Sequence, residues 1–526
     1  MNWLDAGETL LDRFHRQVSA HPNRLCVRYE GKTWSYQEWE DYARQLAIGF
    51  THLGVQPGDK VLLALPNCPE VYASILAVNY VGAVGMPLNI AMSEGEIAFQ
   101  VEDAGCQVGL VTEQVYRLLQ NRREGLPFLR RLVVWDGKPD VHSEDVALNF
   151  LLEQSGDLSH SMAVNPIHVL LYTSGTTGFP KGALLPHTMF AYALDTLEDI
   201  LHFQGNEVCV NMLPNFHLFS IGVEYWIMLD TGGTFVIRSR FDLTDLLQDI
   251  AQFKGTWAAG TPSLYNALHD GAMRLGTDMT HLRQVLVAGA AVSADLSKHW
   301  EALTGGVMFQ AYGMTEIFIA TMEDPSGLRK PGSSGTVHGG AQLVIVDEED
   351  GLLPIHQVGE IVVRLPGGVA EYWNRPEQNA WTQRNDWFHT GDLGYLDKDN
   401  FLYVEDRKKD RVVVNGRDVY SAKVEKVLMQ HPLVSEVAVI GKPVADTSDV
   451  YQEVPVAMVL PRAGAHLVVE DLLQFARIRL EAIEVPREVW LVEAFPRTAT
   501  GKIRKFELRD QMLIRELPQT EKESPH

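Results

Sequence analysis

The chain is poor in cysteine. Its 526 residues include 4 cysteines, at the scattered positions Cys26, Cys68, Cys106 and Cys209. This spacing fits neither a disulfide framework nor a CxxC metal site, so reduced thiols in a cytoplasmic protein are expected. The first residues also lack the basic and apolar regions of a signal peptide.

Positive charge is scarce as well. Lys and Arg number 45 against 68 Asp and Glu, and the formal net charge is -23. A nucleic-acid-binding protein needs a basic face that displaces counterions, so this class of partner is excluded. No apolar run approaches the roughly 20 residues of a membrane-spanning helix. The balance of 46% hydrophobic and 21% charged residues is that of a soluble chain, and its length indicates more than one domain.

Strand-like and helix-like segments alternate as far as residue 341. Ser35 and Glu38 form the pattern of a capping box, and apolar residues follow at helical spacing until Gly54. Such alternation favours parallel sheets with helices on both faces. Turns and β-forming residues predominate from residue 359. A last unit begins near Asp410, with strands expected at 412–414 and 438–440 and helices at 422–430 and 470–480.

One loop combines glycines, hydroxyls and a lysine. After the apolar segment 168–172 the chain reads Tyr172-Thr173-Ser174-Gly175-Thr176-Thr177-Gly178-Phe179-Pro180-Lys181-Gly182. The glycines remove steric bulk, while backbone N–H groups, hydroxyls and the lysine can meet phosphate oxygens. Because no Ser or Thr follows Lys181, this is not the common GxxxxGK[ST] loop. The pattern predicts a polyphosphate-binding loop of another kind.

Further islands of special composition follow along the chain. They are Asn215-Phe216-His217, Ala288-Gly289-Ala290-Ala291, Tyr312-Gly313-Met314-Thr315-Glu316, Thr390-Gly391-Asp392, Asp406-Arg407-Lys408-Lys409-Asp410 and Thr500-Gly501-Lys502. Singly, each has an ordinary explanation as a turn, a helix cap or a solvated charge cluster. In this order they resemble the acyl-adenylate-forming (AMP-binding) superfamily of acyl-CoA synthetases, luciferases and adenylation domains. The resemblance covers residues 33–509 and is closest to bacterial medium- and long-chain fatty acyl-CoA synthetases.

The resemblance implies an α/β fold in two parts. A large N-terminal domain of αβ layers plus a β-barrel-like part would be followed by a small mobile α+β C-terminal domain. Residues 1–408 would form the AMP-binding (adenylation) domain, and residues 409–526 the C-terminal domain that carries the catalytic lysine. In the family the small domain rotates about a hinge, Lys409 here, between two half-reactions.

The implied activity is that of an acid–thiol ligase. A fatty or related carboxylic acid, ATP and coenzyme A would give acyl-CoA, AMP and pyrophosphate through an acyl-adenylate, with Mg2+ as cofactor. The first step brings a carboxylate toward a polyanion. The site must therefore supply positive charge and oriented hydrogen-bond donors.

The resemblance also assigns roles to individual residues. The β- and γ-phosphates would be held by Thr173, Ser174, Gly175, Thr176, Thr177 and Lys181. Glu316 would bind Mg2+, a hard ion that prefers oxygen ligands, and Thr315 would contact the α-phosphate. The adenine slot would be lined by Gly289, Ala290, Ala291 and Tyr312, with Asp392 on the ribose hydroxyls and Arg407 on the ribose or phosphate. Lys502 would bridge the acid and the α-phosphate, Gly416 would let the thiol arm pass, and His217 would shape the acyl and thiol channel.

Several positions depart from the family pattern, mostly in the C-terminal unit. The sequence has Asn415-Gly416 for a pair of glycines, Ser421-Ala422-Lys423-Val424-Glu425 for Pro-Ala-Glu-Val-Glu, Gln452-Glu453 for Gly-Glu, Ile483-Glu484-Val485-Pro486 for Tyr-Lys-x-Pro, and Ala291 for a proline. These positions bear on the thiol donor, so a phosphopantetheinyl carrier protein stays an alternative acceptor. An aryl-CoA ligase and a luciferase-like oxidoreductase are further alternatives, and a homodimer is one of the oligomeric states left open.

The size of the acid is inferred from Gly313. Acetate-specific relatives carry a tryptophan at this position, so glycine predicts a channel open to acids longer than two carbons. Its walls would come from apolar residues after His217, namely Leu218, Phe219, Ile221 and Trp226. The competing explanation is that Gly313 serves only the backbone geometry of a turn.

Overall fold

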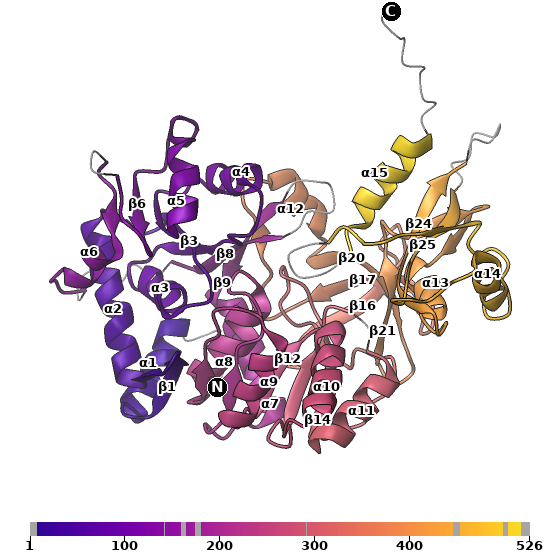
Figure 1. Ribbon diagram of the computed structural model, residues 1–526, viewed down its shortest axis with the longest axis horizontal. Coiled ribbons are helices and arrows are strands. Elements are labelled where there is room, and N and C mark those ends of the chain that lie inside the picture. The colour runs from indigo at the N-terminus through magenta and orange to yellow at the C-terminus, as the bar shows by residue number, and fades with distance from the viewer. Residues whose placement is uncertain are drawn as a thin grey trace, which may run out of the picture.

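A computed structural model describes residues 8–140, 143–158, 165–173, 180–290, 292–444, 453–497 and 503–516. Two eight-stranded sheets form the bulk of the molecule, followed by a five-stranded sheet and two smaller sheets near the C-terminus. The C-terminal elements lie together at one end of the molecule (Figure 1). In the described part of the chain, no helix is long and apolar enough to cross a membrane.

The first large sheet carries the predicted phosphate loop. Its core strands are parallel, whereas β8 and β9 form an antiparallel hairpin and β18 pairs antiparallel with β9 at the edge. Its order is β18 (Glu371–Tyr372), β9 (Lys181–Pro186), β8 (Ile167–Thr173), β4 (Val84–Pro87), β3 (Lys60–Ala64), β5 (Val108–Val111), β6 (Arg131–Val134) and β7 (Val146–Ala147).

The second large sheet is also mainly parallel. Antiparallel pairs close it at both edges, between β14 and β15 and between β1 and β2. Its order is β15 (Thr321–Met322), β14 (Val307–Tyr312), β13 (Gln284–Val287), β12 (Trp257–Gly260), β10 (Val208–Val210), β11 (Thr234–Val236), β1 (Leu25–Tyr29) and β2 (Lys32–Ser35).

Helices connect and cover these strands, as the alternating sequence pattern indicated (Figure 1). They are α1 (Leu10–Ala20), α2 (Tyr36–His52), α3 (Pro69–Tyr80), α4 (Glu94–Ala104), α5 (Glu113–Gln120), η2 (Arg123–Gly125), α6 (Leu148–Glu153), α7 (His187–Leu201), η3 (Phe219–Trp226), α8 (Ile227–Thr231), α9 (Leu243–Gln252), α10 (Pro262–Leu275), α11 (Ala294–Thr304) and α12 (Pro376–Thr382).

Local sequence signals set the bounds of α2. The Ser35 Oγ atom accepts a hydrogen bond from the Glu38 amide at 3.2 Å, and the Glu38 carboxylate accepts one from the Ser35 amide at 2.7 Å. The predicted capping box is therefore confirmed. The helix ends just before Gly54, and its apolar face is fully buried.

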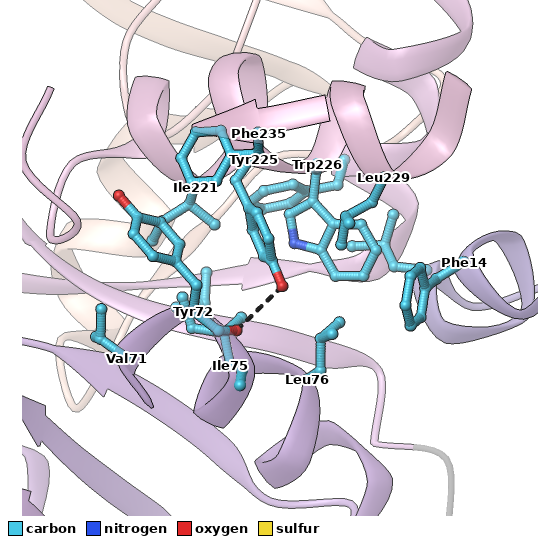
Figure 2. Close-up of a cluster of buried hydrophobic side chains, with 14 of the residues drawn as sticks. Phe14, Val71, Tyr72, Ile75, Leu76, Ile221, Tyr225, Trp226, Leu229 and Phe235 are labelled. Carbon is cyan, nitrogen blue, oxygen red and sulfur yellow. Dashed lines mark hydrogen bonds between the residues drawn. The ribbon is translucent and has the colours of Figure 1, made fainter. Parts of the chain in front are cut away.

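The largest hydrophobic core lies between the two large sheets. It contains strand residues of both sheets together with α3 and η3. Figure 2 shows Tyr72 of α3 packed against Tyr225 of η3, which in turn packs against Trp226. The Tyr225 hydroxyl donates to the Tyr72 carbonyl at 3.2 Å. The segment η3 is a π-helix, a rare conformation that is frequent at functional sites. Because η3 directly follows His217, this core fixes the position of the histidine loop.

The part predicted to be barrel-like is a twisted run of antiparallel strands. It comprises β16 (Gln342–Val346), β17 (Gly359–Arg364), β20 (Trp387–Leu396), β19 (Gln383–Arg384) and β21 (Leu402–Arg407). Strand β21 pairs with β20 and leads directly into the C-terminal unit. It therefore carries the chain from the large part of the molecule to the small one.

The C-terminal unit is α+β, as expected. A three-stranded sheet is buried on both faces by separate apolar clusters. The unit comprises β22 (Val412–Val414), β23 (Arg417–Val419), α13 (Ser421–Leu428), β24 (Val434–Pro443), β25 (Glu453–Pro461), α14 (Val469–Arg477), β26 (Glu488–Leu491) and α15 (Lys505–Glu516). Each strand and helix predicted in this unit coincides with one of these elements within a few residues.

Candidate active site

The predicted phosphate loop joins the two strands of a β-hairpin. Thr173 at the end of β8 pairs with Lys181 at the start of β9, and the Thr173 hydroxyl donates to the Lys181 carbonyl at 3.4 Å. The loop residues Ser174, Gly175, Thr176 and Thr177 lie outside the described residues. The structure thus defines the two ends of the loop, and both belong to the antiparallel pair β8 and β9, next to the edge strand β18 of the first sheet.

Lys181 and Glu316 interact electrostatically although they are far apart in the sequence. Burial lowers the pKa of Lys181, and the carboxylate of Glu316 opposes this shift. Glu316 follows β14 of the second sheet and is itself buried, at 7% exposure. A cation from one sheet and an acid from the other therefore come together at the junction of the two large sheets.

Tyr372 stands between these two charges, and the sequence analysis missed it. Its hydroxyl donates to Glu316 Oε1 at 2.6 Å, and its ring centroid lies 5.5 Å from Lys181 Nζ. Burial and the neighbouring Glu316 carboxylate raise the pKa of Tyr372. Tyr372 lies at the site because β18 pairs with β9. No local pattern in the sequence predicts that pairing.

A second polar group joins the end of β14 to the five-stranded sheet. The Tyr312 hydroxyl donates to Asp392 Oδ2 at 2.8 Å, and Arg407 Nε lies 3.3 Å from Asp392 Oδ1. Asp392 and Arg407 are register partners in β20 and β21. Burial and the adjacent Asp392 raise the pKa of Tyr312. Three of the predicted nucleoside-binding residues are thus in contact with one another.

Gly289 and Ala290 lie close to this group. They follow β13, which pairs in parallel with β14, so the two strands end at the same edge of the sheet. Both residues are exposed, and Ala291 lies outside the described residues. Thr315 is partly buried on the loop between Tyr312 and Glu316.

His217 is held in a turn before η3. Its amide donates to the Pro214 carbonyl at 3.0 Å, and its Nδ1 atom accepts from the Phe219 amide at 3.2 Å. Because Nδ1 is an acceptor, this geometry corresponds to the neutral ring with its proton on Nε2. His217 is partly exposed, whereas the core lies directly behind it.

A buried polar network beneath His217 was not foreseen. The carboxylate of Glu224 on η3 accepts hydrogen bonds from Asn211 Nδ2 at 2.7 Å and from the Met212 amide at 2.9 Å. Complete burial raises the pKa of Glu224 to about 8. Asn215 adds a link to the first sheet, because its Nδ2 donates to the Leu65 carbonyl at 3.0 Å. These bonds fasten the loop of His217 to both large sheets.

The expected opening at Gly313 is wrong. A Cβ atom at this position would lie 1.9 Å from the main-chain oxygen of Phe318, so the space is already filled by backbone. Phe318 has a left-handed conformation, with φ of 56°, and its ring is buried. Gly313 therefore serves close backbone packing, which was the competing explanation.

The expected walls of the acyl pocket need correction too. Ile221 and Trp226 have no exposed surface and point into the core between the sheets (Figure 2). The Trp226 indole donates to His168 Nε2 at 2.8 Å, which fixes the ring away from His217. Leu218 is almost fully buried as well, and Phe219 is the only one of these four residues that is partly exposed.

Gly416 lies in a tight hairpin of the C-terminal unit. Asn415 and Gly416 join β22 to β23 with φ values of 51° and 72°, the left-handed pair of a type I′ turn. Asn-Gly is the preferred sequence for this turn, so the departure from two glycines keeps the backbone geometry. A Cβ atom at Gly416 would meet no other atom within 4 Å.

Lys502 lies outside the described residues, whereas the residues on either side of residues 498–502 are described. Arg497 and Ile503 form an isolated β-bridge, and Arg504 Nη2 lies 3.8 Å from the Glu96 carboxylate on α4. Helix α4 belongs to the large N-terminal part of the molecule. The chain that follows Lys502 is therefore in contact with that part.

Two departures from the family pattern turn out to be partners. Lys423 stands where the family has an acid, and Glu484 stands where it has a lysine. Their side chains form an ion pair with Nζ and Oε1 2.5 Å apart. The charges of this pair are exchanged relative to the family pattern, and its net charge is unchanged.

Ser421, a third departure, forms a bond that proline cannot. Its hydroxyl donates to Asp406 Oδ2 at 2.8 Å and accepts from Lys505 Nζ at 2.8 Å. Asp406 belongs to β21, and the two other residues belong to α13 and α15. The interaction therefore links the last strand of the large part with two helices of the C-terminal unit.

Comparison with known proteins supports the predicted family. Residues 14–373 match the AMP-binding enzyme family, and residues 423–502 match the AMP-binding enzyme C-terminal domain. The long-chain-fatty-acid–CoA ligase of Bacillus subtilis (strain 168) is 29% identical over 96% of this chain and 95% of its own length. A feruloyl-CoA synthase from an Amycolatopsis species is 31% identical over 94% of this chain and 97% of its own.

A solved structure agrees over almost the whole chain. The crystal structure of the anthranilate CoA ligase AuaEII in complex with anthranoyl-AMP has a TM-score of 0.87 and 26% sequence identity, and covers 97% of this chain and 98% of its own. The predicted fold class and the predicted enzyme class, an AMP-forming acid–thiol ligase, are confirmed. The chain belongs to the AMP-binding enzyme family, among the adenylate-forming CoA ligases.

Proposed function

We propose that this enzyme activates a fatty or related carboxylic acid with ATP and transfers the acyl group to coenzyme A. The approach of Lys181 and Glu316 around Tyr372 is the observation that carries the proposal. Adenylation needs a cation for the phosphates and an acid for a metal at one place. These two groups come from different sheets, so their meeting depends on the whole fold.

The reaction consists of two steps, adenylation of the acid and transfer of the acyl group to the thiol. The acid's carboxylate oxygen attacks the α-phosphorus of ATP, the bond to the bridging oxygen breaks, and acyl-AMP and pyrophosphate form. The thiol of coenzyme A then attacks the acyl carbon, loses its proton, and displaces AMP. We assign Lys181 and the loop beginning at Thr173 to the phosphates, and Lys502 to the acid and the α-phosphate.

The nucleoside is assigned to the group around Tyr312. Asp392 already accepts a hydrogen bond from Tyr312 and faces Arg407, so it is held in place before a ribose arrives. Both of its oxygens are acceptors suited to vicinal hydroxyls. The exposed segment at Gly289 and Ala290 would lie against the adenine.

The chain fits Mg2+ held by a single protein carboxylate. In the described ranges, no group of three or more His, Cys, Asp or Glu side chains could form a closed metal site. Mg2+ is usually bound by one or two carboxylates together with substrate phosphates. Glu316 would hold the ion, and the ion would neutralise charge on the phosphates when bound.

The ion pair of Lys423 and Glu484 supports coenzyme A as the thiol donor. An alternative acceptor was inferred from several departures in the C-terminal unit, and two of them, Lys423 and Glu484, compensate each other in charge. Transfer to a phosphopantetheinyl carrier protein is therefore the weaker alternative. The hinge at Lys409, the domains 1–408 and 409–526, and the cytoplasmic location remain predictions from the sequence.

An aryl acid is the second candidate substrate. The feruloyl-CoA synthase is as similar to this chain as the fatty-acid ligase is. The channel expected at Gly313 is filled by main-chain atoms, so Gly313 does not favour long alkyl chains over aryl acids. The deciding experiment is a pyrophosphate-release screen over octanoate, palmitate, benzoate, ferulate and anthranilate, with and without coenzyme A. Release with none of these acids would refute the proposal. Release with acyl transfer only to a carrier protein would refute the assigned acceptor.

A further inference from the structure

Residues 371–375, called the strap here, run along the outer edge of the phosphate-loop hairpin. Tyr372 pairs with Ala183 of β9, and the Trp373 amide donates to the Gly182 carbonyl at 2.8 Å. The strap therefore adds an edge strand to the hairpin immediately beside Lys181. This edge faces Glu316, which arrives from the second sheet.

The backbone of Tyr372 is fixed on its other side as well. The Asn379 side chain accepts from the Tyr372 amide at 2.8 Å and donates to the Tyr372 carbonyl at 2.9 Å. Asn379 lies in α12, so the helix holds the strand residue through both of its peptide groups. A side chain anchored in this way can fix the orientation of its neighbours.

The far end of the strap is tied to helix α4. Arg375 Nη2 lies 2.7 Å from one oxygen of Asp103, and the Tyr172 hydroxyl donates to the other oxygen at 2.7 Å. Tyr172 immediately precedes Thr173 on β8. One carboxylate on α4 thus joins the strap to the first strand of the hairpin.

We propose that Tyr372 is a positioning residue for adenylation, orienting the Glu316 carboxylate toward Mg2+ and aligning Lys181 with the phosphates. Its hydroxyl donates to Glu316 Oε1 and so fixes the orientation of the carboxylate that would hold the metal. Its ring supports the Lys181 ammonium at 5.5 Å. This inference rests on the proposed adenylation and adds a residue that the family motifs in the sequence did not indicate.

The bonding of Tyr372 favours this role over simple packing. A buried tyrosine needs one acceptor, and a main-chain carbonyl would suffice, as for Tyr192, whose hydroxyl donates to the His338 carbonyl at 2.9 Å. Tyr372 instead donates to Glu316, whose carboxylate acts electrostatically on Lys181. A hydrogen bond to a charged group is stronger and more directional than one to a neutral group.

The test compares Tyr372→Phe with the control Tyr192→Phe. Both changes remove one partly buried, hydrogen-bonded hydroxyl, but only the first alters a contact to Glu316. ATP binding is measured by calorimetry over a range of Mg2+ concentrations, without acid or coenzyme A. For Tyr372→Phe we expect the Mg2+ concentration for half-maximal ATP binding to rise by about tenfold, the loss expected for one hydrogen bond to a charged group. ATP binding in EDTA and the binding curves of the control should match the wild type.

A double-mutant comparison separates positioning from general damage. If Tyr372 acts through Glu316, adding Tyr372→Phe to Glu316→Gln should change the Mg2+ requirement by less than twofold. A full tenfold further effect in the double variant would overturn the inference, as would an unchanged or lower Mg2+ requirement in Tyr372→Phe. A wild type whose ATP binding does not depend on Mg2+ would instead refute the proposed function, and the inference with it.

Discussion

The exchanged ion pair between Lys423 and Glu484 gives a quantitative prediction. The pair joins α13 to the segment before β26, with Nζ and Oε1 2.5 Å apart. The Glu484 side chain is 9% exposed and that of Lys423 is 43% exposed. Solvent around the lysine screens the attraction, so we place its contribution near the upper end for exposed pairs, about 1 kcal/mol.

Each single reversal should cost more than the loss of the pair. Lys423→Glu places two carboxylates together, and we expect it to destabilise α13 by about 1–2 kcal/mol. Glu484→Lys places two ammonium groups together and also removes the carboxylate that accepts the Glu481 amide at 3.0 Å. Its cost should be about 2 kcal/mol.

The double exchange restores the charge order of the family. Lys423→Glu with Glu484→Lys should recover about 2 kcal/mol relative to the sum of the single changes. Amide hydrogen exchange in α13 is the assay, because it reports local opening, and each kcal/mol corresponds to about a fivefold change in exchange rate. The control exchanges Arg477 and Glu470 of α14, whose side chains are 52% and 67% exposed, and should show no measurable coupling. Additive effects at Lys423 and Glu484 would refute the reasoning.

Other variants test the half-reactions, the turns and the pH dependence. Lys502→Ala should reduce pyrophosphate release by several orders of magnitude, whereas thioester formation from synthetic acyl-AMP and coenzyme A should be unchanged; equal loss in both assays would show a structural role. Gly416→Asn should keep the left-handed turn and near-normal thioester formation. Gly416→Leu should lose thioester formation, so that acyl-AMP accumulates. Normal thioester formation by the leucine variant would contradict the prediction that the thiol arm passes Gly416. Gly313→Ala should lower the melting temperature by several degrees, because its Cβ would lie 1.9 Å from a main-chain oxygen; an unchanged melting temperature would contradict the backbone-packing explanation. Burial lowers the pKa of His187 from its ordinary value of 6.5 to about 4, so the free energy of unfolding should fall by about 3 kcal/mol as the pH falls from 6.5 to 4. Denaturant unfolding of the wild type and of His187→Gln at these pH values should show that the free energy of unfolding depends less on pH in the variant. Equal pH dependence in both proteins would contradict this assignment.

Local features of the fold could be predicted because they depend on neighbouring residues. The capping box at Ser35 and Glu38 is one example, since its hydrogen bonds span a single turn. The strand 412–414 is another, because a short apolar run and an Asn-Gly turn together define a hairpin. The family motifs likewise allowed the chemistry of the site to be predicted, because each motif is a set of residue types in a fixed order along the chain.

Gly313 shows where such reasoning fails. The sequence shows that residue 313 has no side chain, but it does not show which atoms occupy the space that a side chain would take. In the structure the main chain of Phe318 fills it, and this depends on how the loop after β14 folds back. Likewise, the apolar character of Ile221 and Trp226 suited both a substrate channel and a core, and the direction of η3 assigned them to the core.

The sequence by itself determined the family, the order of the strands and helices, and the residue types available for adenylation. The tertiary structure alone decided which of those residues meet. Tyr372 reaches Glu316 through the pairing of β18 with β9, and Lys423 reaches Glu484 through the packing of the C-terminal unit. The physical reason is the sequence separation between the residues that interact. Backbone conformation and side-chain chemistry follow from a few adjacent residues, whereas hydrogen bonds and ion pairs between distant segments exist only after the sheets have assembled.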